Sequence, residues 1–166
     1  MKELLQGRRL GFALRPVFGQ LGLGMAFAAL LLDLGAWFAW GTRETNAFVW
    51  AAYWLAIAAA LGGLLAFVTA LAELRDVPDE ERSLARIDLA VVALATVTAA
   101  LSAAIRSGEL GAAGASPAPL LLGVLSLLAF AAAAFTGGGL YAPREWEEIE
   151  EALPRERHSR RRTATH

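Results

Sequence analysis

Charged residues divide the sequence into four long stretches that carry almost no charge. A helix needs about 20 apolar residues to cross the hydrocarbon core of a bilayer, which is roughly 30 Å thick. All four stretches reach that length, and we expect one transmembrane helix in each, over residues 17–40, 47–72, 84–105 and 118–141. Short connections between these helices favour antiparallel packing. The sequence therefore predicts an all-α protein, an integral membrane bundle of four antiparallel helices.

The overall composition is consistent with a membrane protein. Hydrophobic residues form 57% of the chain and charged residues 19%, whereas soluble domains contain roughly 45–50% and about 25%. The first apolar stretch is longer than the ~7–15 residues of a signal peptide, and no cleavage site follows it before more apolar sequence. We therefore interpret this stretch as a membrane span.

The distribution of Lys and Arg predicts the orientation in the membrane. Thirteen of the fifteen lie in the N-terminal part, around the connection between the second and third helices, or in the C-terminal tail. Only Arg43 and Arg106 lie on the other side. Because cytoplasmic loops are rich in Lys and Arg, both termini should be cytoplasmic. We expect a cytoplasmic segment over 1–16, the membrane domain over 17–142 and a cytoplasmic tail over 143–166.

The tail is expected to have two parts. Residues 144–153 can form a short amphipathic helix of their own, separate from the fourth span. Residues 155–166 are polar and basic, and they are too polar to fold alone. Two interpretations of this end remain open: a disordered segment close to anionic lipid headgroups, or a segment that docks onto a partner protein.

The chain contains few residues that perform chemistry. It has no cysteine, and its two histidines, His158 and His166, both lie in the polar tail. Disulfides and thiolate metal sites are therefore excluded, and no histidine of the apolar stretches is available to bind haem, copper or zinc. No catalytic motif is present, so we expect no enzyme, no catalytic residue, no cofactor and no metal. A net charge of −1 gives no indication of a nucleic-acid partner.

Small residues recur at steps of three and four in every expected helix, which places them on one face. Gly19, Gly22 and Ala26 begin such a series in the first helix, and a stripe on the third helix passes through Thr98 and Ser102. Small faces let helix backbones approach closely in lipid, so helix packing is one interpretation. A solvated pathway along Thr98 and Ser102 is the other. No internal repeat is evident.

Asp33 is the only charge inside the first expected span, and it lies on the small-residue face. Charged residues in membrane spans are costly and often mark function. One interpretation is a structural tie to Arg106, to Arg43 or to a threonine hydroxyl. A second is a proton or cation relay, and a third is a protonated acid that donates a hydrogen bond.

Several short motifs are spread along the sequence. The run LLQG stands at 4–7, LLDL at 31–34 contains Asp33, Arg106 closes the third expected helix, and TGGGLY stands at 136–141. Together they resemble a bacterial family of predicted membrane proteins, catalogued as domain of unknown function 2231. The resemblance covers roughly residues 4–142 and implies a protein of the bacterial inner membrane, but it implies no known activity.

The sequence departs from that family at its histidines. Where the family carries histidine, this chain has Phe12, Arg15 and Gln20 near its beginning and Asp88 in the third expected helix. A haem or metal role of those histidines is therefore not carried over. Arg15, just before the first helix, and Asp88 should lie at similar depth and can form a salt bridge that replaces the family's site. The alternative is that Arg15 reaches the headgroups alone while Asp88 caps its helix or is solvated.

The main functional hypothesis is an accessory or structural subunit of a larger membrane complex. It rests on the lack of chemical motifs and on more small-residue faces than four helices satisfy among themselves. The expected partners are the lipid bilayer and other membrane subunits or a second copy of the chain. The alternative is a small transporter or proton-conducting bundle that uses Asp33 and the stripe of Thr98 and Ser102. The expected intramembrane ion-pair residues are Arg15, Asp33, Asp88 and Arg106.

Overall fold

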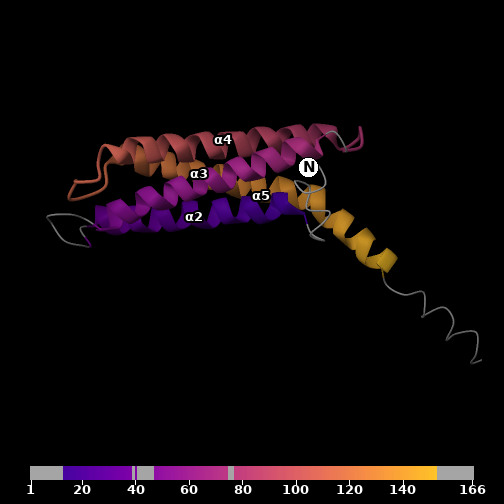
Figure 1. The fold of residues 1–166 in the computed structure, drawn as a ribbon, viewed down its shortest axis with the longest axis horizontal. Coiled ribbons are helices and arrows are strands. Elements are labelled where there is room, and N and C mark those ends of the chain that lie inside the picture. Colours follow the sequence, from indigo (N-terminus) through magenta and orange to yellow (C-terminus); the bar gives the residue numbers. More distant parts are fainter. Residues whose placement is uncertain (1–12, 39, 41–46, 75–76, 153–166) are drawn as a thin grey trace, which may run out of the picture.

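The computed structural model describes residues 13–38, 40, 47–74 and 77–152, with side chains described up to residue 140. Four helices run along the length of the molecule (Figure 1). They are α2 over Leu14–Trp37, α3 over Ala47–Glu73, α4 over Arg82–Ser107 and α5 over Pro117–Ala152. Each helix contains a segment long and apolar enough to cross a membrane, which in α5 is Pro117–Leu140. The predicted all-α four-helix bundle is confirmed, and the chain is a multi-pass membrane protein with four candidate spans.

The helices form a closed ring in which each packs on two neighbours. The extensive contacts join α2 with α3, α3 with α4, α4 with α5 and α5 with α2. Consecutive helices run in opposite directions (Figure 1), so α2 and α4 run in the same direction and face each other across the bundle axis. We call the end at which α2 and α4 begin the near end, and the end at which they finish the far end.

The first helix begins and ends earlier than the sequence predicts. It starts at Leu14 instead of residue 17, so Arg15 lies in its first turn and not before it. Pro16 does not prevent this, because a proline in the first turn removes an N–H group that has no partner within the helix. The helix ends at Trp37, and the two following helices agree with the predicted bounds to within two residues.

The fourth helix is longer than predicted. A separate short helix over 144–153 was expected, but α5 continues without a break from Pro117 to Ala152, and its last turns extend beyond the other helices (Figure 1). Pro143 removes one backbone hydrogen bond of the helix. The residues around it are mostly good helix formers, which explains why the helix continues. The predicted boundary at 142 therefore lies close to the end of the apolar span at Leu140, and the helix continues past it.

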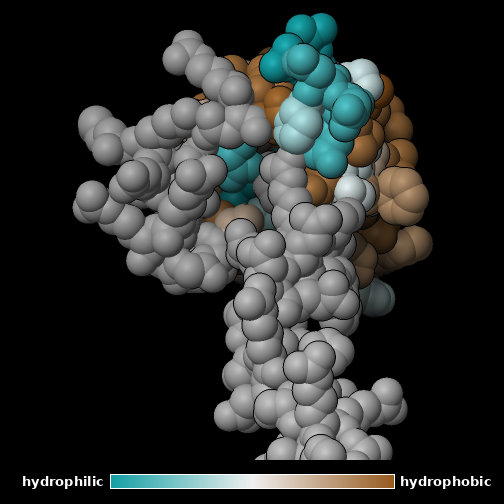
Figure 2. Space-filling view, turned by 90° about the vertical axis from the view of Figure 1, so that its right-hand side faces the viewer, coloured by the Kyte–Doolittle hydropathy of each residue, from teal (hydrophilic) through white to brown (hydrophobic). Residues whose placement is uncertain are grey.

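Large and small side chains are distributed in opposite ways in this bundle. Alanine and glycine fill most of the interior, whereas most of the described leucine, phenylalanine and tryptophan side chains lie outside; Phe135, for example, is 86% exposed. Figure 2 views the near end, and hydrophobic residues cover the visible flank of the bundle while hydrophilic residues gather at one side of that end. At the far end Trp50 and Trp54 are half exposed and pack edge to face, as in the aromatic belts of membrane proteins.

Phe130 fills the middle of the interior. Its side chain is 1% exposed and packs in a cluster with alanines of α2, α3, α4 and α5. Gly22 and Gly63 make room for the ring, because a Cβ atom would come within 2.6 Å of it at Gly22 and 2.9 Å at Gly63. These two glycines are therefore required by the close approach of α2 and α3 to the phenylalanine of α5.

Candidate functional site

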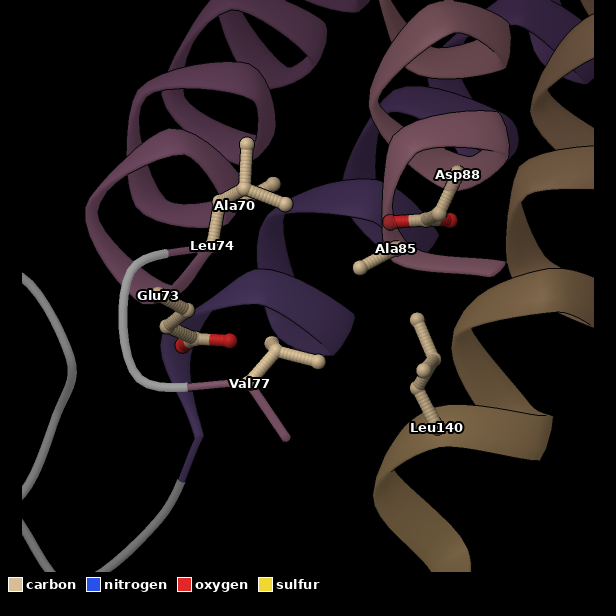
Figure 3. Close-up of a pocket in the computed structure, with 7 residues that line it drawn as sticks. All are labelled: Ala70, Glu73, Leu74, Val77, Ala85, Asp88 and Leu140. Atoms are coloured by element: carbon tan, nitrogen blue, oxygen red, sulfur yellow. The ribbon is translucent and has the colours of Figure 1, made fainter. Parts of the chain in front are cut away.

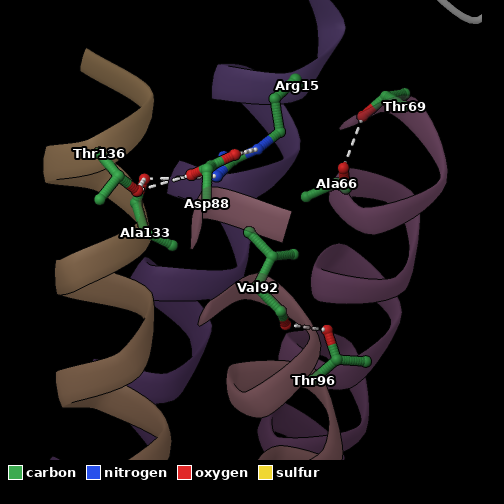
Figure 4. Close-up of polar contacts among 8 residues, drawn as sticks. All are labelled: Arg15, Ala66, Thr69, Asp88, Val92, Thr96, Ala133 and Thr136. Carbon is green, nitrogen blue, oxygen red and sulfur yellow. Dashed lines mark hydrogen bonds and ion pairs between the residues drawn. The ribbon is translucent and has the colours of Figure 1, made fainter. Parts of the chain in front are cut away.

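At the near end, Arg15 of α2 and Asp88 of α4 form a buried ion pair (Figure 4). Arg15 Nε donates to Asp88 Oδ2 at 3.1 Å, and Arg15 Nη2 donates to Asp88 Oδ1 at 2.5 Å. Both residues are 1% exposed. The predicted salt bridge is therefore present and bidentate, and the alternative in which Arg15 points to the headgroups does not describe this structure.

Helix α5 completes the near-end pair. Arg15 Nη2 also donates to the Ala133 carbonyl oxygen at 3.3 Å, and the Thr136 hydroxyl donates to Asp88 Oδ1 at 2.7 Å. Gly19 leaves the space that the guanidinium occupies, because a Cβ atom there would lie 2.6 Å from Arg15 Nη1. The pair thus joins α2, α4 and α5 in one hydrogen-bond network.

A small pocket adjoins Asp88 at the near end (Figure 3). Residues of α3, α4, α5 and the connection after α3 line it, and its free volume is about 10 Å³. The carboxyl groups of Glu73 and Asp88 reach it from different helices (Figure 3). A volume of ~10 Å³ accommodates about one water molecule, so this pocket is too small for an organic substrate.

At the far end, Asp33 of α2 pairs with Arg106 of α4. Of the partners expected for Asp33, the structure therefore selects Arg106; Arg43 lies outside the described residues. Arg106 also donates to the Ser102 hydroxyl and, from Nη2, to the Pro119 carbonyl oxygen at 3.3 Å. Asp33 and Arg106 are 1% and 2% exposed, so this pair is also enclosed by the bundle.

The hydroxyl groups of the expected polar stripe bind backbone carbonyl groups. Thr98 is within hydrogen-bond distance of the Leu94 and Ala95 carbonyl oxygens of its own helix, at 2.8 and 3.0 Å. Ser102 donates to the Pro119 carbonyl oxygen at 2.9 Å. The stripe is buried. The Thr98 hydroxyl bonds within α4, and the Ser102 hydroxyl joins α4 to α5.

Sequence reasoning missed the contribution of α5 to both pairs. The carbonyl groups of Ala133 and Pro119 accept from the two arginines, and Thr136 donates to Asp88. A backbone carbonyl has no sequence signature. Thr136 belongs to the small-residue face of the fourth helix, and that face was the only available signal.

The two ion pairs follow the same spacing. Asp88 is 73 residues after Arg15, and Arg106 is 73 residues after Asp33. Within each helix the two charges are 18 residues apart, which is five turns and about 27 Å along the helix axis. The charges are exchanged between the helices, because α2 begins with the base and α4 with the acid.

The buried positions between these charges also repeat. On α2 they include Gly19, Gly22, Ala26 and Ala29, and the residues 73 positions later on α4 are buried as well, namely Val92, Ala95, Ala99 and Ser102. The sequence contains no evident repeat, but α2 and α4 share this pattern of buried positions. The repeated property is burial and position along the axis, whereas residue types differ, which is why the sequence does not reveal it.

The chain matches no family model, no curated protein and no solved structure. Among the described residues no group of three or more His, Cys, Asp or Glu side chains is placed to hold a metal ion. The arrangement that remains is a pair of buried, neutralised charge networks, one at each end of an apolar core. Such networks fix the relative positions of helices.

Proposed function

We propose that this protein is a structural, non-enzymatic accessory subunit of a larger membrane complex. The proposal rests on the two buried ion pairs. Both cross the bundle axis, and in both the arginine also donates to a backbone carbonyl oxygen of α5. They join helices that otherwise have few contacts with each other. Removing one partner of such a pair is expensive, so these charges favour one arrangement of the four helices.

The interior between the pairs supports a structural role. The pairs are about 27 Å apart, close to the hydrocarbon thickness of roughly 30 Å, so each lies near one edge of the membrane. Phe130 and alanines fill the space between them. The hydroxyl groups of Thr98 and Ser126 in that region donate to carbonyl oxygens, which leaves them engaged within the bundle.

The small-residue faces of this bundle do not provide the contact with a partner. A surplus of small-residue faces was expected to seek other subunits, but the bundle buries these faces against its own helices. A partner subunit therefore meets the outer surface, where large apolar side chains such as Phe135 and Leu128 are exposed. Contact with a partner would then resemble contact with lipid in its chemistry.

A complementation experiment tests the structural role. The chain is deleted from its host, and membrane complexes are compared by native electrophoresis in mild detergent; one complex should lose stability or disappear. The variant Asp33→Leu/Arg106→Met replaces a buried pair by apolar side chains, which often preserves stability. It should restore the complex as well as the wild-type chain does. A folded double variant that fails to restore it would contradict a purely structural role.

The second proposal is a small transporter or proton-conducting bundle. It rests on the Asp33–Arg106 pair, which is ionisable and is buried near the ends of α2 and α4. In that case Asp33 is the exchanging group, with Thr98 and Ser102 beside the path. Asp33→Asn would then abolish proton flux in liposomes while the protein stays folded. A structural role predicts the reverse, lower thermal stability and no flux that depends on Asp33.

We also propose a location in the bacterial inner membrane. The bias of Lys and Arg supports an orientation with both termini in the cytoplasm of a bacterial cell. Cysteines at 79 and 112 should label from opposite sides, with 79 inside. We further propose a relation to the family of domain of unknown function 2231 on the sequence motifs that resemble it, two of which contain Asp33 and Arg106 of the far-end ion pair.

A further inference from the structure

One buried donor at the far end has no partner among the described residues. Arg106 is 2% exposed, and its two terminal nitrogens bind Asp33, Ser102 and the Pro119 carbonyl. Its Nε atom donates to nothing. Buried N–H groups in proteins are nearly always bonded, either to protein or to ordered water. The unpaired Nε therefore indicates an acceptor that is not among the described residues.

Arg106 also lines a pocket inside the bundle, and all four helices contribute to it. The free volume of the pocket is about 10 Å³, which is close to the space needed for one water molecule. Alanines of α2, α3 and α4 and Gly123 of α5 provide the apolar part of the lining. Arg106, Ser102 and Ser126 provide the polar part.

We infer that this pocket binds a single ordered water molecule. The water oxygen accepts from Arg106 Nε, and its hydrogens bind hydroxyl oxygens of the lining. Ser126 suits this role, because its hydroxyl donates to the Ala95 carbonyl oxygen at 3.2 Å and keeps its acceptor positions. An anion is disfavoured because Asp33 already neutralises Arg106, and a larger ligand exceeds the volume. The water site is separate from the proposed partner interface.

The near end provides a comparison within the same protein. There the corresponding atom, Arg15 Nε, donates directly to Asp88 Oδ2 at 3.1 Å. Its guanidinium is enclosed by Gly19 and Gly137, whose added Cβ atoms would lie 2.6 and 3.6 Å from Nη1. The Nε atom of the near-end arginine is therefore bonded within the protein, and among the described residues the unpaired arginine Nε lies at the far end.

Water-to-methyl magnetisation transfer in lipid bilayers tests the inference on the full, unaltered chain labelled with ¹³C-alanine. Ala59 and Ala99 line the pocket, whereas Ala66 and Ala133 are equally buried but pack with Val92 in a separate cluster. Transfer to the Ala59 and Ala99 methyl groups should be several times faster than transfer to the other two. Equally slow transfer at all four methyl groups would overturn the inference.

Two glycine variants on α5 locate the water. An added Cβ at Gly123 lies 3.5 Å from Arg106 Nη2, an ordinary contact, so Gly123→Ala should fold while it reduces the pocket. Gly138 has no atom within 4 Å of an added Cβ, and Gly138→Ala is the matched control. Gly123→Ala should slow the transfer to Ala59 and Ala99 to the rate found for Ala66 and Ala133. Gly138→Ala should leave that transfer unchanged. Unchanged transfer in Gly123→Ala would place the water elsewhere and overturn the inference.

Discussion

The two ends of the bundle each hold an Arg–Asp pair between α2 and α4, but they satisfy the arginine differently. At the near end the guanidinium meets Asp88 with two nitrogens, and Thr136 adds a third bond to the same carboxylate. At the far end Arg106 distributes its bonds over a carboxylate, a hydroxyl and a carbonyl, and leaves Nε unpaired. Bidentate pairs are the stronger arrangement, so the near end should be the tighter of the two.

The positions of the charges explain why α2 depends on α4. Acids are favourable near a helix N-terminus and bases near its C-terminus. Helix α4 follows this rule, with Asp88 in its second turn and Arg106 in its last turn. Helix α2 reverses it, since Arg15 is at its start and Asp33 near its end. The charges of α2 are therefore stabilised by the opposite helix and not by their own.

The largest effect is expected at the near end. Arg15→Met leaves Asp88 buried without its cation, and removing one partner of a buried pair costs about 3–5 kcal/mol. The free energy of unfolding in mixed detergent micelles should fall by that amount. The double variant Arg15→Met/Asp88→Leu should recover most of the loss, because no charge remains buried. A single variant as stable as the wild type would contradict the proposed importance of this pair.

The equivalent change at the far end should have a smaller effect. Arg106→Met also leaves an acid unpaired, but Asp33 loses one bond from the arginine where Asp88 loses two. A hydrogen bond to a charged group contributes about 1.5–3 kcal/mol, so the loss of stability should be smaller than in Arg15→Met by roughly this amount. Equal losses at the two ends would remove the distinction between them.

Two threonines test the networks one hydrogen bond at a time. Thr136→Val removes the bond to the Asp88 carboxylate, and a bond to a charged group contributes about 1.5–3 kcal/mol. Thr98→Val removes bonds only to carbonyl groups of its own helix, which contribute little to helix stability. Unfolding should therefore respond to Thr136→Val and hardly to Thr98→Val. The opposite order would mean that the stripe on α4 matters more than the near-end network.

The region between the ends depends mainly on packing, and Gly22→Ala tests it. The added methyl group would lie 2.6 Å from the Phe130 ring, and overpacking of this kind costs about 1–3 kcal/mol. Gly24→Ala, with no atom within 4 Å, is the control and should not destabilise the protein. In a Phe130→Leu background the cost of Gly22→Ala should decrease. An unchanged cost would show that the ring is not what limits the space.

Much of this architecture could be predicted from the sequence, because hydropathy identifies the spans and helix direction sets the depth of each charge. The pairing of Arg15 with Asp88 follows from that depth, since the first and third helices run in the same direction. The choice among the expected partners of Asp33 does not follow from it. That choice depends on which helices are diagonal in the ring, and this is a property of packing.

Other features of the site have no signal in a single sequence. The acceptors at Ala133 and Pro119 are backbone carbonyls, and the continuation of α5 past Pro143 reflects the balance between one lost hydrogen bond and a helix-forming neighbourhood. The sequence shows the small-residue faces, but it does not show which surface each face packs against. Whether they meet within the bundle or on a partner depends on the three-dimensional arrangement of all four helices.

Double-mutant cycles test whether the two pairs cross the bundle axis and hold α2 against α4. The cycles combine Arg15→Met with Asp88→Leu, and Asp33→Leu with Arg106→Met, and use unfolding free energies in micelles. In each cycle the double variant should lose far less stability than the two single variants together, because each single variant leaves one charge buried without its partner and the double variant leaves none. The cross combination of Arg15→Met with Asp33→Leu, five turns apart on α2, should be additive. Additive behaviour within either proposed pair would contradict the account.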